Sequence, residues 1–108
     1  MRFFVHYDEG PQPFCKKFDT RSLPDDATLN DVVLLFLHAA VAKHGPGHPL
    51  GHPLEVLRDT RASSLMGILA VCDADECYLD LMAPVDAEEG ADLTVSLPAR
   101  EKAHVQGA

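Results

Sequence analysis

At the start of the chain, Phe3, Val5 and Tyr7 alternate with Phe4 and His6. Over Arg2–Asp8, aromatic and β-branched residues fall on both faces of an extended segment, which is typical of a strand. Residues 9–13 combine Gly and Pro in a turn sequence, and we expect Phe14–Ser22 to form a second strand. The start of the chain therefore predicts a β-hairpin with a long loop.

A helical pattern begins after residue 28. Thr28 is a suitable N-cap, and Asp31 at the third helical position lies at the positive end of the helix dipole. We expect the helix to run from Leu29 to about Lys43 and to end at Gly45-Pro46.

This helix is apolar nearly all round when residues are placed at 100° intervals. We expect one face to be buried, with Val33, Phe36, Leu37, Ala40 and His44. The opposite side carries Asp31, Leu35, His38 and Ala42. An exposed Leu35 would be available to a partner.

The elements after the helix are short. Gly47–Leu54 contains Gly-His-Pro-Leu twice and predicts a loop. Four strands are expected after it, at Leu54–Arg58, Leu65–Cys72, Cys77–Met82 and Asp92–Leu97. Strands collected on one face of a single helix give an α+β two-layer domain.

The hairpin, the linker Leu23–Thr28 and the Leu/Val-rich helix together resemble the ubiquitin-like β-grasp superfamily. This resemblance implies an α+β domain over residues 1–98, with a mixed sheet of four to five strands packed on one long helix. Residues 99–108 are expected to be a flexible tail or the start of a linker. The chain ends Gln106-Gly107-Ala108 rather than Gly-Gly, which disfavours a role as a conjugated modifier.

The charge is strongly negative and unevenly placed. Nine Lys and Arg against 17 Asp and Glu give a formal net charge of −8, which disfavours nucleic acid as a partner. Residues 62–97 hold eight acidic side chains and no Lys or Arg. A surface of one sign is either an ordinary solvated face or a docking surface for a basic protein.

The number of cysteines and the hydropathy of the chain indicate the cellular compartment of the protein. Three Cys residues suggest buried thiols in a reducing environment rather than a disulfide framework. The start of the chain lacks the apolar core of a secretory signal, and the run Val32–Ala42 is too short to cross a bilayer. We therefore expect a cytoplasmic protein without membrane contacts.

Two members of the superfamily imply binding surfaces here. Similarity to Ras-association domains implies a basic second strand that meets an acidic partner, with Lys16, Lys17 and Arg21 as the cations. Similarity to Phox/Bem-type domains implies an acidic loop that takes a Lys from a neighbour, with Asp73, Asp75, Glu76 and Asp80 as the acids. If both surfaces are present, one copy could bind the next head to tail.

Catalytic and metal-binding alternatives are weaker. His44, His48 and His52 have a four-residue spacing, which aligns ligands only on a helix, and Gly and Pro interrupt this segment. Cys72 and Cys77 lack C-x-x-C spacing, so we expect two core thiols. No nucleotide-binding, zinc-protease or hydrolase motif occurs in the chain.

The sequence therefore predicts a non-catalytic protein–protein interaction module that needs no cofactor. The resemblance implies the N-terminal domain of a larger intracellular scaffold or adaptor, as in cytoskeletal scaffolds. Two alternatives remain open: a self-associating module that pairs Lys16 and Lys17 with the acidic run 73–89, and a metal-binding protein or small enzyme that uses the three histidines.

Overall fold

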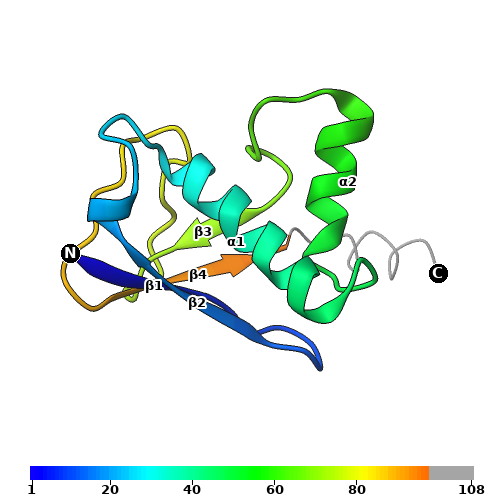
Figure 1. The fold of residues 1–108 in the computed structure, drawn as a ribbon, viewed down its shortest axis with the longest axis horizontal. Coiled ribbons are helices and arrows are strands. Elements are labelled where there is room, and N and C mark those ends of the chain that lie inside the picture. Colours follow the sequence, from blue (N-terminus) through cyan, green and yellow to red (C-terminus); the bar gives the residue numbers. More distant parts are fainter. Residues whose placement is uncertain (98–108) are drawn as a thin grey trace.

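A four-stranded mixed sheet, in the order β2-β1-β4-β3, forms the base of the molecule (Figure 1). The computed structural model describes residues 1–97, so the tail expected at 99–108 lies outside the described residues. The strands are β1 (Arg2–Tyr7), β2 (Phe14–Asp19), β3 (Ala70–Cys72) and β4 (Ala91–Ser96). β1 pairs antiparallel with β2 and parallel with β4, and β3 pairs antiparallel with β4. The chain is thus an α+β protein, as the sequence predicted.

One long helix, α1 (Leu29–His44), packs across one face of this sheet (Figure 1). Its predicted start is confirmed, because Thr28 and Asp31 form a reciprocal capping box. The next two backbone N–H groups are also satisfied: Leu29 donates to the Ala83 carbonyl at 3.1 Å and Asn30 to that of Leu81 at 2.8 Å. The segment that follows β3 is therefore tied to the first turn of α1.

The hydrophobic core lies between α1 and the sheet. Phe3 stacks on Phe18 with ring centroids 5.7 Å apart, and Phe14 contacts Phe36 at 5.3 Å. The helical residues that are buried are Leu29, Asn30, Val32, Val33, Phe36, Leu37 and Ala40. Leu35 on the opposite side is 50% exposed, so the predicted orientation of the helix is confirmed.

A second helix, α2 (Gly51–Thr60), replaces the loop expected at Gly47–Leu54 and the strand expected at Leu54–Arg58. The expectation of one helix was wrong, because Gly51 and Pro53 lie in the first turn of α2 and do not break a helix there. Pro53 lies in the first turn of α2, where the missing N–H has no helical acceptor to lose. The helical period is present in the sequence, at Leu50, Pro53, Leu54 and Leu57.

The other strands are shorter than the sequence suggested. β2 ends at Asp19, whose side chain accepts a hydrogen bond from the Arg21 backbone N–H and starts a 3-10 turn over Thr20–Ser22. Of the strand expected at Leu65–Cys72, only β3 forms, because the chain turns at Gly67 with a φ of 80°.

Cys77–Met82 is an irregular segment and not a strand. Its contact with β3 consists of a bridge between Cys72 and Tyr78 and a hydrogen bond from the Leu79 N–H to the Val71 carbonyl. This segment nevertheless lies along the outer side of β3 and occupies that edge of the sheet.

Candidate binding surfaces

β2 is the open edge of the sheet. In the described residues β1 is its single strand neighbour, whereas the outer side of β3 is bordered by residues 77–79. An edge strand presents unpaired N–H and C=O groups to any extended segment that approaches it.

The backbone groups that face outward on β2 follow from its pairing with β1. Thr20 donates its N–H to the Met1 carbonyl at 2.8 Å, so this pair is hydrogen-bonded across the ladder. In an antiparallel ladder, hydrogen-bonded pairs alternate with pairs that are not hydrogen-bonded. The backbone groups of residues 14, 16 and 18 therefore bond to β1, and those of residues 15, 17 and 19 point away from it. Within residues 1–97, the outward groups of Cys15 and Lys17 make no backbone hydrogen bond.

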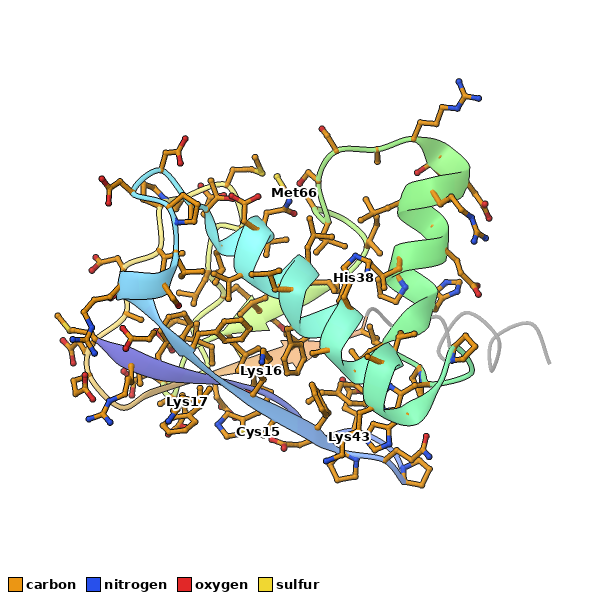
Figure 2. All side chains as sticks on the ribbon, in the orientation of Figure 1. Cys15, Lys16, Lys17, His38, Lys43 and Met66 are labelled. Carbon is orange, nitrogen blue, oxygen red and sulfur yellow. The ribbon has the colours of Figure 1, made fainter. Side chains whose placement is uncertain are left out.

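Two lysines occupy the middle of this edge, on opposite faces of the sheet. Phe14 and Phe18 point toward α1, so Lys16 shares their side, and its Nζ lies 5.6 Å from the centre of the Phe18 ring. Lys17 points to the other face, opposite Phe4 on β1. Figure 2 shows Cys15, Lys16 and Lys17 in succession along β2. Both lysines are exposed, and neither forms an ion pair within residues 1–97.

Arg21 differs from the two lysines because its charge is compensated locally. It lies beyond the end of β2, and its guanidinium donates to Asp19 at 3.0 Å. Hydrogen bonds from the Arg21 side chain and backbone hold the pKa of the Asp19 carboxyl well below its usual range. The same contact raises the pKa of Arg21. Arg21 is thus less available to a partner than Lys16 or Lys17.

An acidic hollow of about 360 Å³ lies beside β4 and the loops around residues 73–75 and 86–88, with β1 between β4 and β2. Five carboxylates line it: Asp73, Asp75, Asp86, Glu88 and Asp92. Leu79 and Leu93 are among its apolar lining residues. The fold therefore gathers acids that are up to 19 positions apart in the sequence into one concave surface.

The acids predicted from the sequence divide between structural and surface roles. Asp73 accepts backbone hydrogen bonds from Asp75 at 2.9 Å and Cys77 at 3.0 Å, and Asp80 accepts one from Met82 at 2.9 Å. Asp73 and Asp80 therefore fix local turns.

Asp75 is exposed and lines the hollow, whereas Glu76 and Asp80 do not line it. Asp86 and Glu88 were predicted only as members of the acidic run 73–89, and Asp92 lies outside that run. The contribution of Asp92 depends on where β4 lies in the sheet; its Oδ1 is 2.8 Å from the His6 Nε2 on β1.

A third surface is the apolar groove between α1 and α2, of about 430 Å³. Leu34, Val41, Leu54 and Leu57 line it, with His38 and Arg58 among the polar residues. Figure 2 shows His38 between the two helices. Leu35, the predicted apolar contact, is exposed on α1 but does not line this groove.

The three cysteines are free thiols. The expectation that they lie buried in the core is wrong. Cys15 and Cys77 are exposed, and Cys72 is half-buried on the uncovered side of β3. Partial burial, and then the negative charges of Asp92 and Asp8, raise the pKa of the Cys15 thiol. At neutral pH this lowers the fraction of the thiolate, which is the nucleophilic form.

The three histidines of the proposed metal site do not converge. Within residues 1–97, no group of three His, Cys, Asp or Glu side chains has an arrangement that could hold a metal ion. His44 and His48 stack with ring centroids 4.9 Å apart, while His52 lies on α2. His48 Nε2 is 2.7 Å from the Gln12 carbonyl, and its Nδ1 accepts the Leu50 N–H at 3.1 Å. His48 therefore connects the hairpin loop to the turn between the helices.

None of the helices in the described part of the chain is long and apolar enough to cross a membrane. Comparison with known proteins finds no matching family model, no matching curated protein and no matching solved structure.

Proposed function

We propose that the chain is a non-catalytic protein-binding module of the ubiquitin-like β-grasp type, acting in the cytoplasm. The strand order β2-β1-β4-β3, with β1 parallel to β4 and α1 across one face, supports this fold assignment. The expectation from the sequence that the partner is a protein rests on the same resemblance. α2 is an addition to the pattern of one helix.

The binding site is the open β2 edge, and its ligand is an extended acidic segment of another protein. The observation that carries this proposal is the combination of unpaired outward backbone groups at Cys15 and Lys17 with the uncompensated charges of Lys16 and Lys17. Backbone hydrogen bonds would provide affinity, and the two cations would select an acidic partner.

The test is a nuclear magnetic resonance titration of the ¹⁵N-labelled chain with an unstructured acidic peptide of about ten residues. We expect saturable shift changes at residues 14–19, lost in the variant Lys16→Glu/Lys17→Glu. A basic peptide of equal length is the control. Absence of changes at residues 14–19, or equal changes with the basic peptide, would contradict the proposal.

A second candidate is self-association, in which the β2 lysines of one copy bind the acidic hollow of the next. It is favoured by the separation of the two surfaces, since β1 lies between β2 and the strand β4 that lines the hollow. Surfaces that are separate within one chain can meet head to tail between copies.

Sedimentation equilibrium at low and high salt tests this second candidate. Head-to-tail association predicts a mass that rises with concentration at low salt and falls toward 11.8 kDa at high salt. Lys16→Glu and Asp75→Lys should each prevent it, and the two variants mixed should recover contact at one interface. A mass of 11.8 kDa at every concentration and salt would exclude it.

A further inference from the structure

The open β2 edge could also meet β2 of a second copy, since unpaired edge strands tend to pair with each other. Around a two-fold axis the two strands would run antiparallel. The outward groups belong to odd-numbered residues, so an antiparallel pair must align odd with odd. Two registers then give the longest pairing, over residues 15–19 or over residues 14–18.

Each of these registers brings a lysine opposite its own copy. Pairing over residues 15–19 aligns Lys17 with Lys17 of the second copy. Pairing over residues 14–18 aligns Lys16 with Lys16 of the second copy. Side chains directly opposite in a sheet have Cβ atoms about 5 Å apart, and like charges there destabilise the pairing.

We infer that Lys16 and Lys17 make the β2 edge selective: the edge rejects β2 of a second copy and accepts an extended segment with two successive acidic residues. The inference rests on the proposed function, since it concerns the same edge. Because Lys16 and Lys17 point to opposite faces, a partner strand needs an acid on each of its faces to neutralise both. Two adjacent residues of a strand satisfy this requirement.

Mixing two forms of the chain tests this rule without any natural partner. In Lys16→Glu/Lys17→Glu, β2 carries an acid at both positions, so either register places one acid directly opposite a lysine of the wild type. Added to ¹⁵N-labelled wild type, this variant should cause saturable shift changes at residues 14–19, and high salt should weaken them. Unlabelled wild type at the same concentration should cause changes at least tenfold weaker. A magnetic resonance readout suits the weak affinity expected of one short strand pair.

Arg58→Glu/Arg61→Glu is the matched control, because it reverses two exposed charges on the other side of the molecule, at the end of α2. It should leave residues 14–19 of the wild type unchanged. A second variant, Lys16→Thr/Lys17→Thr, removes the repulsion and keeps a residue type that favours strands. It should pair with itself, with shift changes at residues 14–19 that depend on concentration.

Two results would overturn the inference. One is the absence of shift changes at residues 14–19 when both mixed chains give folded spectra. The other is an equal response to Arg58→Glu/Arg61→Glu, which would indicate unspecific attraction. If the acidic peptide binds the edge but the mixed chains do not pair, the proposed function stands and the selection rule is wrong. If the chains pair and the peptide does not bind, the charge selection at the edge stands, and the proposed ligand, an unstructured acidic segment, is wrong.

Discussion

At the scale of single residues, the His48 side chain joins the hairpin loop, the end of α1 and the turn before α2. Its ring lies between the Gln12 carbonyl and the Leu50 N–H, stacks on His44, and meets Tyr7 edge to face with centroids 5.7 Å apart. One ring nitrogen accepts from a backbone N–H, so the other carries the proton that is donated to Gln12. The ring thus fixes the hairpin loop relative to the start of α2.

His48→Ala should lower the free energy of unfolding by about 2 kcal/mol or more, because it leaves two backbone groups without partners. Urea denaturation of both chains measures this loss. His38→Ala, which removes an exposed ring from α1, is the control and should change stability by less than about 0.5 kcal/mol. A loss for His48→Ala as small as that of the control would contradict the structural role.

Acid should destabilise the fold through Asp19 and Glu89. Hydrogen bonds from Arg21 lower the pKa of Asp19, and those from Arg2 lower the pKa of Glu89. A carboxyl with a depressed folded pKa stabilises the protein fully above its unfolded value, near pH 4, and loses this contribution as the pH falls through the folded pKa.

Asp19→Asn should therefore make stability less dependent on pH below about 4. The measurement is thermal unfolding at a series of pH values. Asp25→Asn is the control, since Asp25 is exposed and forms no ion pair within residues 1–97. Parallel pH curves for Asp19→Asn and the wild type would show that the Arg21 contact contributes nothing.

Site residues could be predicted from the sequence where the type of side chain alone determines whether it is exposed. Lys16 and Lys17 are charged residues in the middle of a predicted strand, and a long charged side chain keeps its end in water. Asn30 could not be recognised in the same way. It is buried at the start of α1, where its side chain accepts the Leu65 N–H at 2.8 Å. That role depends on a loop 35 positions away, which local pattern does not report.

At the scale of elements, the contact between α1 and α2 depends on a glycine. A Cβ added to Gly51 would lie 2.9 Å from the Pro46 carbonyl oxygen and 3.3 Å from Val41 Cγ2. The backbone carbonyl cannot move aside as a flexible side chain could. The first turn of α2 therefore approaches the turn that follows α1 as closely as the backbone allows.

Gly51→Ala should destabilise the protein by about 1–3 kcal/mol, because the overlap pushes the first turn of α2 away from the Pro46 carbonyl. Gly47→Ala is a matched control, since a Cβ there meets nothing within 4 Å. Urea denaturation distinguishes the two substitutions. Equal stability of both variants would mean that the turn before α2 relaxes without cost.

Elements were predicted well where a cap or an alternating pattern acts locally, and poorly where tertiary contacts decide. The start of α1 followed from Thr28 and Asp31 alone. α2 was missed because Gly51 and Pro53 were weighed above the period of the leucines around them. The apolar run before β3 forms a turn that buries Leu65 and Leu69 and leaves Met66 exposed, and its apolar sequence alone does not distinguish such a turn from a buried strand.

At the scale of the whole molecule, charge is separated along the sheet. The β2 edge carries two uncompensated lysines, and the acidic hollow beside β4 carries five carboxylates. Carboxylates that share one concave surface repel each other, and salt screens this repulsion.

Asp86→Asn/Glu88→Gln should therefore raise the Tm by about 2 °C at low salt, and the gain should shrink as salt is added. Calorimetry at several ionic strengths measures both effects. Asp25→Asn/Asp26→Asn removes the same formal charge from a loop that does not line the hollow, and it should have a smaller effect. An equal gain in the control would attribute the effect to net charge alone.

The parallel pairing of β1 with β4 has a consequence for synthesis on the ribosome. β1 begins at Arg2, while its central partner ends at Ser96, so the middle of the sheet joins the two ends of the described chain. A nascent chain can form the hairpin and α1 early, but β1 keeps one unpaired side until nearly the whole domain has emerged. Contacts so distant in sequence slow folding. A chaperone that shields β1 during this interval would protect the protein when it is most prone to aggregate.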